Sequence, residues 1–550
     1  MLCLICAPSA YLAWHARDIP QLGLLADDAV YLVSGKSLAT GQGYRILSLP
    51  DAPIQTKYPP LFPLLLSVVW RLDPRFPGNL PIAALLAWVM LPLLLTTARL
   101  EFARLGLEPK HATILCAMMA VSAPVVWFSL NLMPELALVS IVLASTMLAD
   151  ADRGGWRAAA AGLLGGTAYL LKSAALPLLL TSPLLFVLRK QYRSAALFLA
   201  AMLPFAAGWT WWAQAHRAAP GDSTWTFYTN YFAYQILNVP WRDYPLVVWV
   251  NLRTLWSSAG ALIVAPVLGG PLGRVPACAG AAVALAGIVM LARRKGVTHY
   301  HAFALGLLPM LAAWHYPPVP RFALPLLPLL LCGLSHAALE AWRVVSGREP
   351  GARRAVALPV LAVLGALTPL ALTAIYIGPL AGLYGLANSA RQQRAGLLAA
   401  YQWIESHTPP DAAFAASDDG VLYLYTGRAA MALHIPPKLL YHEDRSGIAR
   451  EYRAIDTFAA RNHLGYLLQT PSDFEQDFTP AMGREQVDGL LADPQRFRLL
   501  HRSQQAAIYE VKAANRLAAT DDSPVHCCGA YGASVSGSLS ASSNQTLRSR

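Results

Sequence analysis

Residues 76–98 read FPGNLPIAALLAWVMLPLLLTTA, an apolar run of 23 positions without Asp, Glu, Lys or Arg. An α-helix of this length extends about 34 Å, and the hydrocarbon core of a bilayer is about 30 Å thick. Comparable uncharged stretches recur from the start of the chain to about residue 390. The pattern predicts a mainly α protein, a polytopic bundle of membrane-spanning helices.

The composition of the whole chain agrees with a membrane solvent. Of 550 residues, 55% are hydrophobic and 13% charged, and the mean hydropathy is +0.41. These values exclude water-soluble globular, disordered and fibrous proteins. The formal net charge of +12 resides in short clusters between apolar runs, so we expect no nucleic acid partner. Neither a disulfide framework nor a zinc spacing follows from the cysteines, and no cofactor is indicated, although a divalent metal stays open.

Charge-free runs define the predicted spans. Eleven are expected, at residues 1–16, 76–98, 112–134, 136–149, 158–171, 173–188, 194–215, 275–292, 296–320, 322–339 and 355–390. Two further apolar pieces, 58–70 and 254–273, are predicted to be helices that lie in the membrane interface. The first is too short to cross, and the second is rich in Gly, Pro and Ser.

Basic residues set the predicted orientation. With eleven spans and a cytoplasmic N-terminus, the cytoplasmic turns hold fifteen Lys and Arg, whereas the short outer turns hold only Lys172 and Arg321. This asymmetry follows the positive-inside rule, and a twelfth span at 254–273 would move seven of the fifteen to the wrong side. We therefore expect a multi-pass protein of the cytoplasmic (inner) membrane, with a long first loop and the C-terminal part outside the cytoplasm.

Composition divides the chain into three predicted parts. Residues 1–388 form the transmembrane domain, in which the first outer loop, 17–79, is expected to be catalytic. Residues 389–514 combine amphipathic helical pattern with short strand-like runs, which predicts a small extracytoplasmic α/β domain. Residues 515–550 are biased to Ser, Gly and Ala, which predicts a disordered tail. The strand-like runs are 412–416, 464–468 and 506–511.

Two adjacent carboxylates, Asp27 and Asp28, follow the first predicted span. A carboxylate at the membrane face is partly desolvated, which raises its basicity and suits it to removing a proton from a hydroxyl or an amine. The following stretch VYLVSGKSLAT is helical in pattern, so a helix cap at either residue is the alternative.

Two cations adjoin proline-rich turns. Lys57 precedes Tyr58 and a Pro-Pro pair, and Arg321 ends the turn HYPPVPR, which includes Tyr316. A lysine ammonium is a point charge suited to a phosphate, and an arginine can fork onto a phosphate or a carboxylate. The alternative for both residues is an anchor among the lipid headgroups.

Glu135 and Lys172 lie where the predicted spans are short. Charge-free runs of 14 to 16 residues adjoin them, and helices of that length cover only about 21 to 24 Å of the hydrocarbon core. Both side chains are therefore expected below the outer headgroup plane, where charges line cavities, with snorkelling of Lys172 as the alternative. The histidines His299, His301 and His315 do not form a metal-ligand spacing.

In combination, these motifs resemble the type C polytopic glycosyltransferases, which use sugars linked to lipid phosphates and include protein mannosyltransferases and lipid A aminoarabinose transferases. The matches occur in order along the chain: the acidic pair with YLVSGKSLATGQGY after it, Lys57 with Pro-Pro-Leu, Glu135 in the second outer loop, and Arg321-Phe322 before LPLLP. Short C-terminal motifs (WI at 403–404, TPPDA at 408–412 and YTGR at 425–428) are similar to the outer domain of bacterial relatives. Two positions depart from the family pattern, since Asp28 replaces the commoner Glu and Tyr58 separates Lys57 from the prolines.

The resemblance implies a transferase that moves a sugar from a polyprenyl-phosphate donor to a lipid, glycan or protein acceptor outside the cytoplasm, with inversion at the anomeric carbon. The expected general base is Asp27, and Asp28 would orient it or bind the acceptor. Lys57, Arg321 and Lys172 are expected to bind the donor phosphate. Glu135, Tyr58 and Tyr316 are the expected substrate contacts. A transporter or flippase for a lipid-linked anion and a noncatalytic membrane assembly protein are the alternatives.

Overall fold

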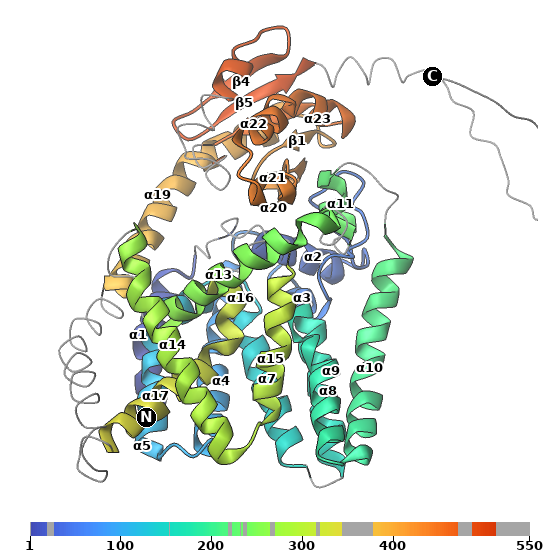
Figure 1. The fold of residues 1–550 in the computed structure, drawn as a ribbon. Coiled ribbons are helices and arrows are strands. Elements are labelled where there is room, and N and C mark those ends of the chain that lie inside the picture. Colours follow the sequence, from blue (N-terminus) through green and yellow to red (C-terminus); the bar gives the residue numbers. More distant parts are fainter. Residues whose placement is uncertain are drawn as a thin grey trace, which may run out of the picture.

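A computed structural model of the chain describes most of its residues (Figure 1). The described residues are 2–18, 22, 27–152, 155–217, 223–230, 233–234, 239–263, 270–314, 320–343, 378–470, 473 and 487–512. Helices form a bundle, and a small sheet with short helices stands above one end of it, as predicted (Figure 1).

Five of the described helical segments are long and apolar enough to cross a membrane. They are Leu80–Arg104 (α4), Tyr192–Ala215 (α10), Trp241–Ile263 (η2, Trp241–Asp243, with α13, Tyr244–Ile263), Arg274–Lys295 (within α14, Gly270–Lys295) and Pro320–Arg343 (α16, Pro320–Ala323, η3, Leu324–Leu326, and α17, Leu327–Arg343). A bent pair, α5 (Pro109–Val121) and α6 (Ala123–Ser129), makes up to six. The chain is thus a multi-pass membrane protein. The count of eleven spans stays a prediction, and most of the run 355–390 lies outside the described residues.

The bent pair occupies the predicted span 112–134. Its two helices meet at an angle of 63°, and the linking Ser122 is extended, with φ −65° and ψ 125°. Pro124, in the first turn of α6, explains the break, because it has no amide hydrogen to donate to a carbonyl of α5 and its ring would clash with the carbonyl four residues earlier in a continuous helix. The uncharged run therefore contains two helices where one was expected.

Shorter apolar helices complete the bundle close to their predicted positions. They are α1 (Leu2–His15), α7 (Glu135–Asp150), α8 (Trp156–Leu171), η1 (Ser173–Ala175), α9 (Pro177–Leu188) and α15 (His299–Ala312). Helix α8 packs between α7 and α10. Close approach to α10 depends on small residues, because a Cβ at Gly162 would lie 2.3 Å from the Phe198 carbonyl oxygen.

The predicted interfacial helix 254–273 is divided in the structure. Its first part is the end of α13 and its last part the beginning of α14, rather than one helix, and 264–269 lie outside the described residues. Glycine lets α14 and α17 approach closely, since a Cβ at Gly287 would lie 1.8 Å from the Gly333 carbonyl oxygen.

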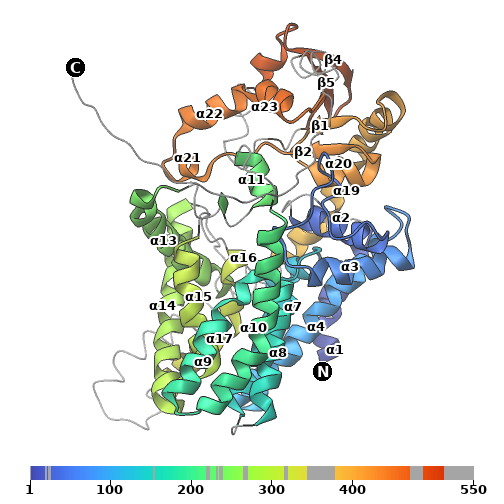
Figure 2. The same ribbon diagram turned by 90° about the vertical axis from the view of Figure 1, so that its right-hand side faces the viewer.

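Helices α2 (Asp27–Ala39) and α3 (Leu61–Leu72) lie at the upper end of the bundle (Figure 2). The predicted interfacial helix 58–70 corresponds to α3. Most of α2 is buried, including Tyr31. The two helices pack through Gly35, where a Cβ would lie 3.0 Å from the Leu66 Cβ, and through a hydrogen bond of 2.9 Å from Trp70 Nε1 to the Leu32 carbonyl. These contacts fix α2 against α3 at this end of the bundle.

A long helix, α19 (Gly378–His407), runs to a five-stranded sheet of order β2-β1-β3-β5-β4. The strands are β1 (Ala413–Ala415), β2 (Ala429–Met431), β3 (Tyr466–Gln469), β4 (Phe497–Arg502) and β5 (Ala507–Val511). The helices beside them are α20 (Asp419–Thr426), α21 (Pro437–Tyr441), α22 (Arg445–Arg453) and α23 (Ile455–Arg461). β1 pairs in parallel with β2 and β3, and β5 pairs antiparallel with β3 and β4. β1, β3 and β5 coincide with the predicted strand-like runs. The exact domain boundaries stay a prediction, and the predicted tail 515–550 lies outside the described residues.

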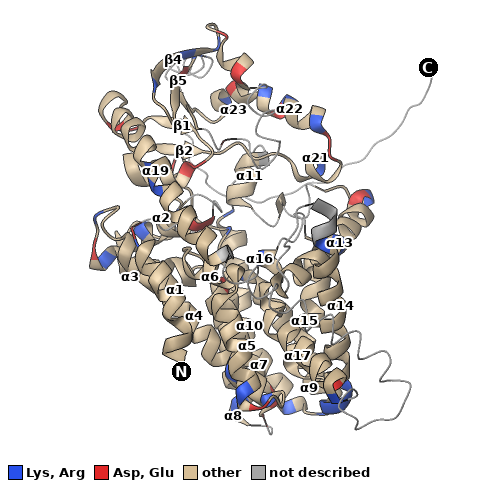
Figure 3. Cartoon of the chain, turned by 90° about the vertical axis from the view of Figure 1, so that its left-hand side faces the viewer, with Lys and Arg blue, Asp and Glu red and all other residues tan. Residues whose placement is uncertain are grey.

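Charged residues gather at the two ends of the bundle, and its middle is largely uncharged (Figure 3). Where α4, α7 and α9 end, Asp150 forms ion pairs with Arg104 at 2.7 Å and Arg189 at 3.1 Å. These arginines belong to the group predicted to face the cytoplasm.

Candidate active site

Arg321, in the first turn of α16, lies between two carboxylates from distant parts of the chain. Its Nη2 donates to Asp27 Oδ2, and its Nε donates to Glu135 Oε1 at 2.7 Å. The three side chains are largely buried, with 12%, 18% and 3% exposed for Arg321, Asp27 and Glu135. Charges removed from water require such compensation, so the bridge joins the starts of α2, α7 and α16.

Glu135 is shared with a second cation. Lys172 Nζ donates to Glu135 Oε1 at 2.5 Å. Lys172 ends α8 in an extended conformation, with φ −159° and ψ 133°. Because Glu135 begins α7, the positive end of that helix dipole also favours its negative charge. The two charges predicted at the ends of short spans therefore form a buried ion pair, and snorkelling does not describe Lys172.

Asp27 is held by a third partner, Tyr58, whose hydroxyl donates to Asp27 Oδ1. Burial raises the pKa of Asp27, but the charges of Arg321 and Lys57 outweigh burial and lower the pKa to about 2. Asp27 is consequently ionised at neutral pH. Both acidic residues lie in the first turn of α2, and Asp28 is buried with its Oδ1 accepting from the Ala29 amide at 2.6 Å.

Lys57 is placed by a tight turn of the first loop. The side-chain oxygen of Gln55 accepts hydrogen bonds from the Lys57 amide at 2.9 Å and from the Tyr58 amide at 3.3 Å. The ammonium lies 3.2 Å from the centroid of the Phe227 ring and 4.8 Å from that of Tyr58. Burial lowers the pKa of Lys57 to about 7, against the opposing effect of Asp27 and Asp419.

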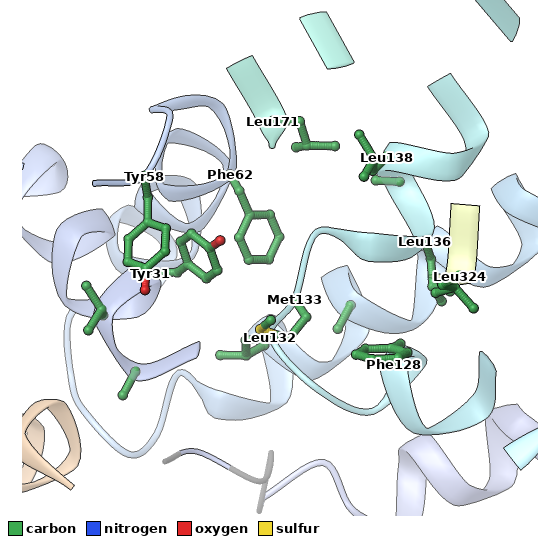
Figure 4. Close-up of a cluster of buried hydrophobic side chains, with 14 of the residues drawn as sticks. Tyr31, Tyr58, Phe62, Phe128, Leu132, Met133, Leu136, Leu138, Leu171 and Leu324 are labelled. Carbon is green, nitrogen blue, oxygen red and sulfur yellow. The ribbon is translucent and has the colours of Figure 1, made fainter. Parts of the chain in front are cut away.

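Aromatic and aliphatic side chains back this charged cluster. The ring of Tyr31 lies 4.7 Å from that of Tyr58 and 5.2 Å from that of Phe62, and Figure 4 shows the three rings together. Leu132 and Met133, just before α7, belong to the same buried group (Figure 4). An apolar wall of this kind strengthens the electrostatic interactions of the adjacent charges.

Sequence reasoning missed the contribution of the C-terminal region. Asp419, in α20, accepts a hydrogen bond from the Tyr228 hydroxyl at 2.7 Å, and burial raises the pKa of Asp419 to about 6. The ring of His434 lies 3.6 Å from that of Phe227. No spacing or motif around these residues signals the contact, because it arises only when the sheet region packs on the bundle.

The structure thus brings together Asp27, Lys57, Tyr58, Glu135, Lys172 and Arg321 of the predicted site residues, and Asp28 follows Asp27 in the first turn of α2. Tyr316 lies outside the described residues. Among the residues that the structure describes, no group of three or more His, Cys, Asp and Glu side chains has a metal-binding arrangement. In such a site the buried cations can bind an anionic group, and the neighbouring ionised carboxylate can accept a proton.

The fold of this chain is similar to that of a solved membrane protein, ArnT. ArnT from Cupriavidus metallidurans bound to undecaprenyl phosphate is 12% identical, with a TM-score of 0.52, over 92% of this chain and 97% of that chain. Its apo state gives a TM-score of 0.49 at 12% identity, over 93% and 98%. The apo oligosaccharyltransferase of Archaeoglobus fulgidus gives 0.44 at 12% identity, over 85% and 70%. No family model and no curated protein matches the sequence. The expected fold is confirmed, and at this identity the likeness concerns the fold alone.

Proposed function

We propose that this protein is a glycosyltransferase that moves a sugar from a polyprenyl-phosphate donor to a lipid, glycan or protein acceptor on the outer side of the cytoplasmic membrane. The observation that carries the proposal is the double bridge of Arg321 to Asp27 and Glu135, beside Lys57. The related fold of ArnT was solved with undecaprenyl phosphate bound, which supports a polyprenyl-phosphate donor.

The donor phosphate is assigned to Lys57 and Arg321, with Lys172 next to them. A phosphate that binds here competes with carboxylates for the same cations, because Arg321 is already paired with Asp27 and Lys172 with Glu135. These cations stabilise the negative charge that develops on the phosphate when the sugar leaves, so the leaving group needs no protonation. Stabilisation that is greatest in the transition state accelerates the reaction.

Asp27 is assigned as the general base. Without donor, Arg321 and Lys57 keep the pKa of Asp27 at about 2, which makes it a weak base. A bound phosphate shares those two cations, so the pKa of Asp27 rises and its basicity appears when the donor is in place. Asp27 then takes the proton of the acceptor hydroxyl or amine. The freed electron pair forms the new bond to the anomeric carbon, and the electron pair of the broken bond stays on the phosphate oxygen.

Asp28, Glu135, Tyr58 and Tyr316 are assigned to orientation and to contacts with sugar or acceptor. The position of α2 and α3 at the upper end of the bundle suits this role, because the lipid tail of the donor must remain in the bilayer while its phosphate meets the acceptor (Figure 2). The uncharged middle of the bundle and the basic lower end support an outward-facing site (Figure 3).

The test uses the purified full chain in proteoliposomes. A panel of undecaprenyl-phosphate sugars, labelled in the lipid, is mixed with a bacterial membrane extract as acceptor. A transferase releases free undecaprenyl phosphate from one of these donors, and vesicles without protein release none. A transporter, a flippase or an assembly protein leaves the sugar–phosphate bond intact. The proposal would be refuted if none of the donors in the panel were cleaved.

A further inference from the structure

The C-terminal region reaches the candidate active site through the first turn of α20. Gly420 packs directly on α2, where a Cβ would lie 2.8 Å from the Ala29 Cβ. A second contact joins β2 to the loop that follows α2, a hydrogen bond of 2.7 Å from the Ala430 amide to the Ser48 carbonyl. Asp419 directly precedes Gly420 and therefore lies next to this contact with the first turn of α2.

The short helix α11 (Ser223–Thr229) lies between the first loop and the C-terminal region. On one side, the Thr56 hydroxyl donates to the Thr229 carbonyl at 2.6 Å. On the other side, the His434 amide donates to the Thr224 hydroxyl at 3.0 Å. One end of α11 is thus hydrogen-bonded to the residue before Lys57, and the other end is hydrogen-bonded to the segment that follows β2.

Tyr228 links α11 to α20 and to the segment that follows β2. Its hydroxyl donates to Asp419 Oδ2 at 2.7 Å and accepts from the Ala432 amide at 3.3 Å. Both Tyr228 and Asp419 are buried. A buried hydrogen bond to a carboxylate is stronger than one between neutral groups, so it fixes the rotation of α11 relative to α20.

The rotation of α11 decides what surrounds the Lys57 ammonium. The Phe227 ring centroid is 3.2 Å from Lys57 Nζ, and the Tyr228 ring centroid is 5.9 Å away. The centroid of the His434 ring lies 3.6 Å from that of the Phe227 ring. A cation held over aromatic faces is attracted to the rings and confined to one position.

We propose that Asp419 is a positioning residue of the donor-phosphate site: through Tyr228 it sets α11 so that Phe227 holds the Lys57 ammonium in place for the phosphate. This inference rests on the proposed function, since it gives Lys57 a phosphate to bind. It makes the C-terminal region part of the donor site rather than an appended module. A lysine already ordered loses less side-chain entropy when the phosphate binds.

Asp419 also acts on Lys57 through charge. The groups that face Lys57 are Asp27, Asp419, Arg321, His434, Tyr58 and Tyr228. The carboxylates raise the pKa of Lys57, and burial and Arg321 lower it. Removing the Asp419 charge therefore lowers the pH at which Lys57 loses its proton, a change that loss of packing alone does not require.

The experiment compares Asp419→Asn and Tyr228→Phe with the wild-type chain, and uses Asp411→Asn, an exposed change in the same region, as the matched control. Binding of undecaprenyl phosphate in detergent micelles is measured at pH 7. We expect about tenfold weaker binding for Asp419→Asn, a smaller loss in the same direction for Tyr228→Phe, and no change for the control. Equal affinity of Asp419→Asn and the wild type would overturn the inference.

A second measurement needs no donor and so separates this inference from the proposed function. Trace labelling with acetic anhydride across pH, read by mass spectrometry at Lys57, reports the deprotonation midpoint of its ammonium. The midpoint should fall by roughly one pH unit in Asp419→Asn and stay constant in Asp411→Asn. An unchanged midpoint refutes the coupling of Asp419 to Lys57 even if the protein is a transferase. If the midpoint is lowered in a protein that cleaves no donor, the midpoint supports the coupling of Asp419 to Lys57, and the absence of cleavage refutes the proposed function.

Discussion

Arg321 and Asp27 form a buried ion pair across 294 positions of sequence. The same guanidinium holds Glu135 through its Nε, so one residue at the head of α16 joins α2 to α7. In the proposed reaction this bridge has two consequences. It keeps Asp27 ionised and weakly basic while the site is empty, and it presents a cation that an incoming phosphate shares.

The sharing of Glu135 predicts a strong dependence of stability on its charge. Glu135→Gln leaves Lys172 and Arg321 as adjacent buried cations, which is expected to destabilise the protein by about 3 to 5 kcal/mol. Adding Lys172→Gln removes one of the two cations and should recover part of the loss. The apparent Tm of the purified protein in detergent measures both effects. Glu340→Gln, at the more exposed pair with Arg294, is the control and should change stability by less than about 1 kcal/mol. Equal shifts for Glu135→Gln and Glu340→Gln would contradict the bridge.

The burial of Lys57 predicts a pH dependence of donor use. Its pKa is lowered to about 7, so the ammonium predominates below this pH and is lost above it. The KM for a sugar phosphodiester donor, whose own charge is constant in this range, should therefore rise as pH increases through 7. Lys57→Arg keeps its charge to high pH, so its KM should not show this rise. Identical pH profiles for the two proteins would exclude Lys57 as the titrating group.

The contact of Gly420 with Ala29 predicts that one methyl group can separate the C-terminal region from α2. Gly420→Ala forces the two apart or distorts them, at an expected cost of about 1 to 3 kcal/mol, together with weaker donor binding. Gly382→Ala in α19 is the matched control, because its Cβ would meet nothing within 4 Å. Both changes carry the same gain in helix propensity, so the difference in apparent Tm isolates the contact. No difference would show that α20 does not pack on α2.

Close packing of α14 against α17 predicts a second glycine effect, this time within the bundle. Gly287→Ala places a Cβ at the Gly333 carbonyl oxygen and should lower the apparent Tm by several degrees. Gly208→Ala in α10 is the control, since nothing lies within 4 Å of its Cβ. A Gly287→Ala protein as stable as the Gly208→Ala protein would contradict the close packing of α14 on α17.

The sequence predicts the bundle well because charge marks the ends of apolar helices. Helix α7 begins at Glu135 and α8 ends just before Lys172, where the charge-free runs begin and end. Breaks inside an uncharged run carry weaker signals, so the charge pattern does not predict the bend at Ser122 or the division of 254–273. The grouping of Asp27, Lys57, Glu135 and Arg321 followed from the resemblance of motifs in their order.

The partners within the site were harder to predict. The sequence assigns Arg321 and Lys172 to a phosphate, whereas the structure pairs both with carboxylates, and no local spacing in the sequence indicates these pairs. Asp419 and Tyr228 are 191 residues apart in the sequence and meet only because the sheet region packs over α2 and α11. Such contacts are properties of the tertiary fold, and neither residue stands in a recognisable motif.

The most direct test of the account uses Asp27→Asn and measures donor binding and transfer in the same preparation. Removing this carboxylate takes a competing anion away from Arg321 but also lowers the pKa of Lys57, so transfer is compared at donor concentrations that saturate both proteins. Transfer from the labelled donor should fall by about 100-fold or more, because the base is lost. Transfer at the wild-type rate, with the protein folded and the donor bound, would contradict the assignment of Asp27 as the catalytic base.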